Sequence, residues 1–354
     1  MDVVSQRDLA LLPKAHLHLH FTGSMRPATL VELAEEQGRR LPPSLRSAAT
    51  IPDSLRLPAT QRGWFRFQHL YDAARAVVDS EAVMRRIVRE AAQDDAAEGS
   101  RRLELQVDPT SYAKFVGGIT PALEIILDEA RSASADTGVE VAIIVAASRI
   151  RHPLEARTLA RLAARHAGRV IGFGLSNDER RGDTGAFGPA FEIAQRAGLA
   201  LVPHGGELLG PAHVREVVDA LHPDRIGHGV RSVEDPALLA RLVEAGVSLE
   251  LCPGSNVSLG VYGQAESVPL TRLMAAGAQI ALGADDPLLF GSRLVDQYRI
   301  AREVHGVDDT GLARLAAGSI RASRAEETTK ARLLAGVDAW LADLPGAGPG
   351  LSRG

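Results

Sequence analysis

The sequence predicts an α/β protein built as a single parallel (β/α)8 barrel of the TIM type. Two observations support this fold class. Eight apolar, strand-like runs alternate with helical patterns along the 354 residues, and histidines and aspartates recur where those runs end. The alternative is an open, doubly wound parallel sheet. The placement of the polar residues at strand ends favours the barrel.

The eight strand-like runs differ in their patterns. Residues 15–20 and 102–107 alternate apolar and polar side chains with period two. Residues 139–147 and 169–175 are rich in valine and isoleucine and nearly continuous, as expected of parallel strands covered on both faces. The other four runs span residues 199–204, 225–229, 247–252 and 279–284.

Helical patterns lie between the strand-like runs. Residues 80–98 begin at a serine suited to the N-cap, carry Val83, Ile87 and Ala91 on one face, and precede Gly99. Several other helices begin with proline, whose missing N–H costs no hydrogen bond in the first turn. These other predicted helices span residues 120–135, 153–167, 189–197, 211–221, 235–245, 267–276 and 294–304.

One domain is expected over residues 1–343, with an insertion at 26–74 after the first strand. The insertion combines several prolines with an aromatic cluster at residues 64–71, although the whole chain is only 4% aromatic. A small core beneath a long loop and a lid over a pocket are compatible interpretations of it. The tail at 344–354 is rich in glycine and proline and is expected to be disordered.

Composition excludes several classes of protein. A net charge of −4 without a basic stripe argues against a nucleic-acid partner. The single cysteine, Cys252, excludes a disulfide framework, a cysteine-rich zinc ribbon and an iron–sulfur site. Residues 1–21 lack a signal-peptide pattern, and the longest apolar run, 141–147, is far shorter than the roughly 20 residues that cross a membrane. A cytoplasmic protein without a membrane partner is therefore expected.

Candidate metal ligands gather at the predicted strand ends. His18 and His20 lie two residues apart in the first run, so their side chains point to one face and can reach one ion. His204 closes the fifth run, His228 closes the sixth, and aspartates 285–286 close the eighth. The carboxyl ends of barrel strands form one face, where active sites lie. These side chains are therefore expected to converge.

The chemistry of this set points to zinc. Three imidazoles and one carboxylate suit zinc and leave room for a water molecule. Bound zinc lowers the pKa of that water from about 15.7 to about 7, which produces hydroxide near neutral pH. Gly205 and Gly206 allow a tight turn that brings Glu207 back toward the site, where a raised pKa would suit a general acid.

Together these residues resemble the adenosine deaminase family of the amidohydrolase superfamily. The resemblance covers about residues 10–340, with the motifs in order and at barrel spacing. The matching segments are 12–20 (LPKAHLHLH), 23–24 (GS), 204–207 (HGGE), 225–229 (RIGHG), 252–256 (CPGSN) and 285–288 (DDPL).

The resemblance implies hydrolytic removal of the 6-amino group of a purine nucleoside, with one Zn²⁺ per chain and release of ammonia. The zinc ligands that it implies are His18, His20, His204 and Asp285. No lysine ends the fourth strand at residues 172–177, which favours one metal ion over two.

The resemblance also implies roles for the residues around the metal. Glu207 would protonate N1 of the purine, and Asp286 would contact N7. His228 would orient the zinc-bound water, or deprotonate it; whether it also binds the metal is open. Asn177 and Gly205 join Thr22 and Asp286 in the predicted substrate-binding set.

The sequence departs from the family pattern at three positions. Adenosine deaminases typically carry aspartate at the position of Thr22, where it contacts the sugar 5′-hydroxyl, and adenine deaminases carry glutamate. Asn177 replaces a glycine whose N–H contacts N3, and His16 replaces a glutamate. Because Thr22 is small and uncharged, a nucleoside with a 5′ extension, such as aminodeoxyfutalosine, would fit.

Other assignments remain open at this stage. Arg26, Trp64 and Arg66 are candidate contacts for a 5′ extension, although each also suits an ordinary surface or packing role. The barrel could instead hold a single-zinc enzyme that deaminates adenine or a pterin, or a non-catalytic relative. The lone cysteine excludes deaminases of the cytidine type. A homo-oligomer is a further open possibility.

Overall fold

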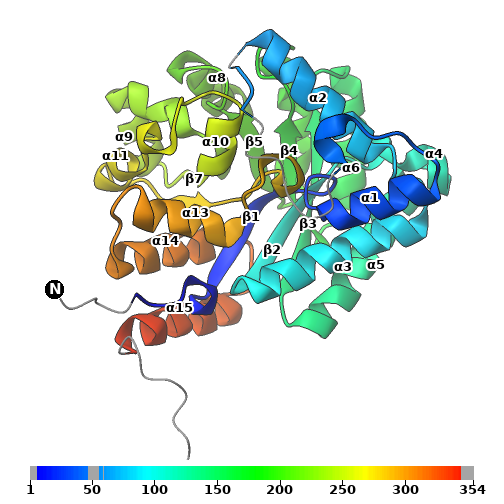
Figure 1. The fold of residues 1–354 in the computed structure, drawn as a ribbon. Coiled ribbons are helices and arrows are strands. Elements are labelled where there is room, and N and C mark those ends of the chain that lie inside the picture. The colour runs from blue at the N-terminus through cyan, green and yellow to red at the C-terminus, as the bar shows by residue number, and fades with distance from the viewer. Residues whose placement is uncertain (1–5, 47–55, 59, 344–354) are drawn as a thin grey trace, which may run out of the picture.

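The computed structural model describes residues 6–46, 56–58 and 60–343, and it confirms the predicted barrel (Figure 1). Eight parallel strands follow one another in sheet order, with helices between them. All eight predicted runs form strands. They are Lys14–His20 (β1), Ser100–Val107 (β2), Glu140–Ser148 (β3), Val170–Ser176 (β4), Ala200–Gly205 (β5), Arg225–His228 (β6), Ser248–Leu251 (β7) and Ile280–Leu282 (β8).

The chain after β8 closes the barrel onto β1. The backbone N–H of His20 donates to the carbonyl of Asp285 at 3.0 Å, and the N–H of Asp285 donates to the carbonyl of His18 at 3.0 Å. These bonds continue the parallel pairing past the end of β8. The closure therefore places Asp285 beside two of the predicted metal ligands.

The predicted helices are confirmed, and their caps follow the expected chemistry. The Ser80 hydroxyl accepts from the N–H of Val83, and prolines occupy the first turn of several helices. The helices are Pro27–Glu36 (α1), Gln61–Arg75 (α2), Glu81–Ala97 (α3), Ala113–Val116 (α4), Ile119–Thr137 (α5), Pro153–Arg165 (α6), Gly188–Arg196 (α7), Pro211–Leu221 (α8), Pro236–Glu244 (α9), Pro253–Ser258 (α10), Leu270–Ala275 (α11), Pro287–Phe290 (α12), Leu294–Glu303 (α13), Asp309–Ala322 (α14) and Glu327–Ala342 (α15).

Two long helices near the C-terminus were not among those predicted. Helix α14 is rich in alanine and packs against β8 and β1, which lets it cover the seam of the barrel. Helix α15 buries few apolar side chains, so its sequence carries only a weak helical pattern. Figure 1 shows α15 at the bottom of the barrel, far from α2. None of the described helices is long and apolar enough to span a membrane.

The described part of the insertion forms α1 and α2, while residues 47–55 and residue 59 lie outside the described residues, as does the tail. Trp64 and Phe67 of α2 are buried, and Phe67 stacks on Phe290 with ring centroids 5.5 Å apart. This supports the interpretation as a small core. Phe65, by contrast, is 54% exposed. Lid movement stays a prediction.

Close packing of α14 on β8 gives a prediction about stability. A Cβ atom at Gly318 would meet the carbonyl oxygen of Ile280 at 2.7 Å. Gly318→Ala is therefore expected to lower the free energy of unfolding by about 1–3 kcal/mol, measured by urea denaturation. Gly188→Ala in α7 is the control, because its Cβ would lie 3.5 Å from the nearest backbone atom. Equal losses in both variants would contradict the prediction.

Candidate active site

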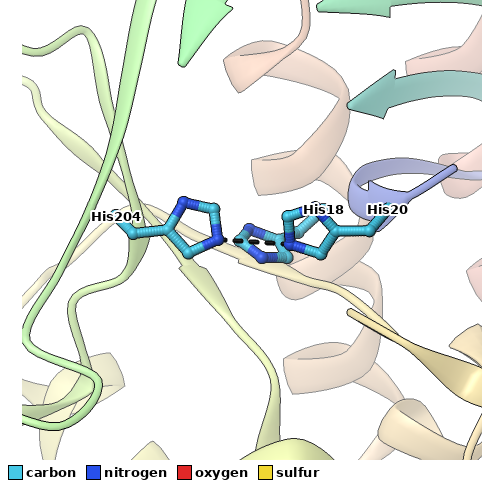
Figure 2. A group of neighbouring side chains, drawn as sticks. All are labelled: His18, His20 and His204. Carbon is cyan, nitrogen blue, oxygen red and sulfur yellow. Dashed lines mark hydrogen bonds between the residues drawn. The ribbon is translucent and has the colours of Figure 1, made fainter. Parts of the chain in front are cut away.

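The three histidines predicted to bind a metal meet at the carboxyl end of the barrel (Figure 2). His18 and His20 extend from β1, and His204 extends from β5 on the other side. The Nε2 atoms of His20 and His204 lie 3.2 Å apart, and one nitrogen from each of the three rings falls within 4.8 Å of the others. Imidazole nitrogens so close together suit coordination of a single ion.

Asp285 completes this group. Its Oδ1 lies 3.2 Å from Nε2 of His20 and 3.6 Å from Nε2 of His18. The Nε2 atom of His18 is buried and has no hydrogen-bond partner among the described residues, which fits a nitrogen that binds a metal. We call His18, His20, His204 and Asp285 the metal group. Its donor set fits one divalent cation.

The electrostatics of the metal group also favour a cation. Burial acts to lower the pKa of His18, but the Asp285 and Glu250 carboxylates outweigh it and raise the pKa to about 10. Burial and the neighbouring histidines hold the pKa of His204 well below its ordinary value. The carboxylates beside His18 thus stabilise positive charge at the metal group. The neutral ring of His204 offers a lone pair to a cation.

Backbone conformation marks the same place. The described residues include four non-glycine residues with positive φ: Asn177 (82°), His222 (47°), His228 (63°) and Asp285 (63°). His222 lies at the C-terminal cap of α8, where such a conformation is common. The other three were all predicted site residues. A left-handed backbone conformation costs free energy at a histidine or an aspartate. Such strained residues are found most often at functional sites.

Neighbouring side chains hold the metal group in place. The Ser255 hydroxyl donates to Oδ2 of Asp285 at 2.6 Å, and Nδ1 of His18 lies 2.8 Å from Oε2 of Glu250. Nη2 of the buried Arg149 donates to the backbone carbonyl of His204 at 2.7 Å. Each contact fixes the orientation of one candidate ligand.

Glu207 folds back toward the metal group, as its sequence context predicted. Gly206 takes a φ of 72°, and Oε1 of Glu207 lies 3.6 Å from Nε2 of His228. Burial, followed by the charges of Asp285 and Glu179, raises the pKa of Glu207 well above its ordinary value. A carboxyl group that keeps its proton at neutral pH suits a general acid.

Glu179 anchors this loop, and the sequence patterns gave it no role. Its carboxylate accepts hydrogen bonds from the backbone N–H groups of Glu207, Leu208 and Leu209, at 2.8–3.1 Å. No spacing rule links position 179 to position 207, because α7 and β5 separate them. His213 of α8 is also buried, with Nδ1 3.7 Å from Oε2 of Glu179.

Asp286 lies on the other side of the metal group and is also buried. Burial and then the charge of Asp285 raise the pKa of Asp286 well above its ordinary value. Its carboxylate packs against Gly23, where a Cβ atom would approach Oδ1 of Asp286 to 1.8 Å. Glycine at position 23 is therefore required for Asp286 to occupy this place.

A cavity of about 240 Å³ opens above these groups. It is bounded by the metal group on one side and by α2 on the other. Most predicted site residues line it. Those lining the cavity are His20, Asn177, His204, Glu207, His228, Asp285 and Asp286, together with Trp64, Phe67, Gln68, Tyr71, Asp72, Arg75, Gln106, Tyr112, Ser148, Arg151 and others from β1–β4 and their loops.

Thr22 and Gly205 lie behind the cavity wall. Thr22 is fully buried, and its hydroxyl lies 2.6 Å from the hydroxyl of Tyr112, which does line the cavity. Gly205 faces Val217 of α8. Among the candidates for a 5′ extension, Trp64 lines the cavity, Arg66 is exposed, and Arg26 pairs with Asp94 at 2.7 Å.

Comparison with known proteins places the chain among purine deaminases. The model of the family described as "Adenosine deaminase" matches residues 13–340. A Streptomyces coelicolor protein named as a candidate adenosine/adenine deaminase is 60% identical, across 95% of this chain and 98% of that protein. An Agrobacterium fabrum adenine deaminase is 34% identical, across 92% and 97%. The crystal structure of an Arthrobacter aurescens adenine deaminase superposes with a TM-score of 0.85 at 30% identity, across 93% and 99%.

Tight packing of the imidazoles gives a prediction about metal binding. A Cβ atom at Gly227 would lie 2.9 Å from Cε1 of His18 and 3.1 Å from Nδ1 of His204. Gly227→Ala should therefore displace both rings and weaken Zn²⁺ binding by about 10–100-fold in a chelator competition. Gly172→Ala creates comparable crowding in β4, 3.2 Å from two neighbours, and is the control. Unchanged affinity in Gly227→Ala would refute the prediction.

Proposed function

The chain belongs to the adenosine deaminase family, and on this premise we propose that it is a zinc-dependent deaminase of 6-aminopurines with free adenine as its best substrate. The family comprises hydrolases that act on C–N bonds of cyclic amidines, so hydrolytic deamination of a purine is its chemistry. One observation carries the proposal. Three members of the metal group (His20, His204 and Asp285) line one cavity together with the buried Glu207 and Asp286.

The metal group would hold one zinc ion, which when bound supplies an activated water molecule as the nucleophile. His228 lies beside it, with Nε2 3.9 Å from Oδ2 of Asp285. Burial lowers the pKa of His228 to about 3, so the ring is neutral and its lone pair can accept a hydrogen bond from the attacking water. His228 is thus placed to orient that water and to pass a proton on rather than to retain it.

Glu207 and Asp286 would bind the purine from opposite sides. Protonated Glu207 donates to N1, which draws electrons from C6 and makes it open to attack. Protonated Asp286 donates to the lone pair on N7. Water adds its oxygen at C6, and one of its protons passes by way of His228 to the 6-amino group. The C6–N6 bond then breaks and ammonia leaves, while the remaining hydroxyl proton returns to Glu207 and N1 keeps the proton it received. The purine product carries oxygen at C6.

The wall around Thr22 supports adenine over a nucleoside. Thr22 is fully buried behind the cavity wall, and its hydroxyl is bonded to that of Tyr112 at 2.6 Å, so the position offers no side chain that projects into the cavity toward a sugar hydroxyl. Tyr71, which is half-buried, lies beside them and Asp286. Two of the relatives described above are named as adenine deaminases. A nucleoside with a 5′ extension is the second candidate, because the cavity continues to Arg75 and Arg151.

A substrate panel tests the proposal. The zinc-loaded protein is assayed with adenine, adenosine, a 5′-substituted adenosine and a pterin, by ammonia release and purine absorbance. We expect kcat/KM for adenine to exceed that for either nucleoside at least tenfold. A higher value for the 5′-substituted nucleoside would replace the substrate assignment with the second candidate. Turnover of the pterin alone would overturn the purine assignment.

Replacing the proposed acid provides the next prediction. Glu207→Gln keeps the shape of the side chain and removes its transferable proton, so kcat should fall by about 10²–10⁴-fold with bound zinc unchanged. Glu216→Gln removes a carboxylate from an exposed position on α8 and should leave kcat unchanged. Full turnover by Glu207→Gln would exclude this residue as the acid.

Removing the Tyr112 hydroxyl tests the basis of substrate choice. Tyr112→Phe removes the partner of the Thr22 hydroxyl and empties the place of the Tyr112 oxygen in the cavity wall. A sugar hydroxyl could then reach Thr22 through that gap, so kcat/KM for adenosine relative to adenine should rise by about 2–10-fold. Tyr262→Phe is the control, because Tyr262 is half-buried and does not line the cavity. An unchanged ratio in Tyr112→Phe would show that the Thr22 hydroxyl does not determine the preference for adenine over adenosine.

A further inference from the structure

A chain of buried charged side chains runs from His18 through the barrel interior. Nδ1 of His18 lies 2.8 Å from Oε2 of Glu250, and the other oxygen of Glu250 accepts from Nε of Arg225 at 2.6 Å. Nη2 of Arg225 donates to Glu104 at 2.7 Å, and Arg102 donates to Glu104 from the other side at 3.0 Å. We call Glu250, Arg225, Glu104 and Arg102 the interior ion chain.

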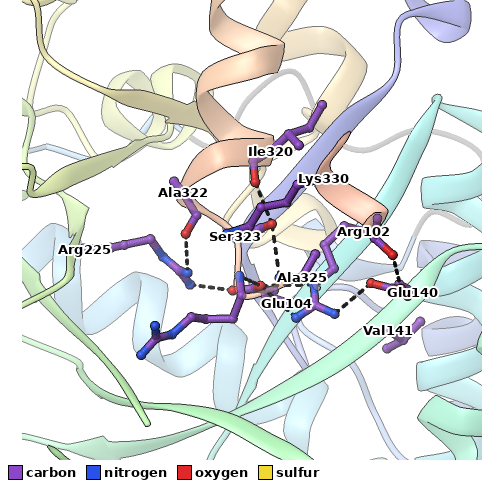
Figure 3. A network of polar contacts seen from close by, with 12 residues as sticks. Arg102, Glu104, Glu140, Val141, Arg225, Ile320, Ala322, Ser323, Ala325 and Lys330 are labelled. Atoms are coloured by element: carbon purple, nitrogen blue, oxygen red, sulfur yellow. Dashed lines mark hydrogen bonds and ion pairs between the residues drawn. The ribbon is translucent and has the colours of Figure 1, made fainter. Parts of the chain in front are cut away.

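The interior ion chain reaches the amino ends of the strands, because Arg225 begins β6 and Arg102 lies near the start of β2, whereas the cavity is at their carboxyl ends. Figure 3 shows its contacts there. Nη1 of Arg225 donates to the carbonyl of Ala322 at 2.9 Å, and the N–H of Arg324 donates to Glu104 at 2.6 Å. Ala322 is the last residue of α14, and Arg324 lies in the link between α14 and α15. The chain therefore tethers this C-terminal link to the side chain of His18.

Burial makes the pairing within this chain obligatory. The side chains of Glu250 and Glu104 are fully buried, and that of Arg225 is 2% exposed. Two carboxylates alternate with two guanidiniums, so each charge is compensated. Burial acts to raise the pKa of Glu104, but Arg225 and Arg102 outweigh it and keep the pKa below its ordinary value. Glu104 is therefore an anion that needs both partners.

Glu250 is placed to orient the ring of His18. Because Oε2 of Glu250 lies 2.8 Å from Nδ1 and can accept its N–H, Nε2 is the ring nitrogen left to face Asp285. That Nε2 is the buried atom 3.6 Å from Oδ1 of Asp285. Arg225 uses two of its guanidinium nitrogens to hold Glu250 and Glu104 in a fixed geometry.

We propose that Glu250 and Arg225 are positioning residues for His18, which fix the tautomer and ring orientation that present Nε2 to the metal. The proposal rests on the zinc site of the proposed function. Affinity for the metal then depends on a buried ionic network that reaches the far end of the barrel. A network that only fills the barrel interior would support the fold and leave metal affinity unchanged when altered without unfolding.

Two substitutions weaken the chain without removing a whole side chain. Glu250→Gln keeps the shape, but its amide N–H₂ must face either Arg225 or Nδ1–H of His18, both of which are donors. Arg225→Lys keeps the positive charge, but a single ammonium cannot reproduce the planar fork that bridges two carboxylates. Arg102→Lys is the matched control, because Arg102 is also buried and pairs with Glu104 but does not touch Glu250.

Zinc affinity is measured for each folded variant by competition with a chromogenic chelator, with circular dichroism as the test of folding. We expect Glu250→Gln and Arg225→Lys to bind Zn²⁺ about 10–100-fold more weakly, and Arg102→Lys to stay within about threefold of the unsubstituted protein. If Glu250→Gln does not fold, Arg225→Lys decides the outcome.

Two results would overturn the proposal. One is unchanged affinity in Arg225→Lys, and the other is an equal loss in Arg102→Lys, which would show that the network merely supports the barrel. Neither measurement uses a purine. A protein that binds zinc as expected but deaminates no purine would therefore overturn the proposed function and leave this proposal standing.

Discussion

The pairing of Asp285 with β1 is the constraint on which the candidate site depends. Two backbone hydrogen bonds join Asp285 to His18 and His20, so the same contact closes the barrel and brings a carboxylate to two imidazoles. His204 reaches them from β5 across the barrel. The ligands come from three distant parts of the chain, and only a closed barrel with this register gathers them. The same backbone contacts therefore close the barrel and assemble the candidate site.

The positive φ angles show how that geometry is maintained. Asn177, His228 and Asp285 each end or follow a strand, and each turns its backbone into the left-handed region at that point. An ordinary extended residue would carry the side chain along the alternating pattern of its strand. The left-handed turn redirects it toward the shared cavity instead. Burial of all the surrounding groups supplies the packing that holds the strained backbone.

Local patterns in the sequence predict the strands and the metal group, because each depends on a few neighbouring residues. His18 and His20 share a face by strand periodicity, and the glycines before Glu207 signal its turn. The roles of Glu179 and Tyr112 could not be predicted, because their partners are far away in the sequence. Glu179 bonds to residues 207–209, and Tyr112 bonds to Thr22. Helix α15 lacks a strong amphipathic pattern because it buries few apolar side chains.

Asp285, Glu207 and Asp286 are three buried carboxyl groups around one cavity. Because their negative charges repel one another, ionisation of one raises the pKa of the other two. Asp285 contacts His18 and His20, which hold its pKa well below the ordinary value against the effect of burial. Its negative charge then adds to burial in raising the pKa of Glu207 and of Asp286. The arrangement favours a negative charge on Asp285, which suits a cation, and favours the protonated forms of Glu207 and Asp286. Under the proposed function, a purine would present ring nitrogens with lone pairs to these two groups, so the repulsion that raises their pKa values would also make the cavity complementary to the base.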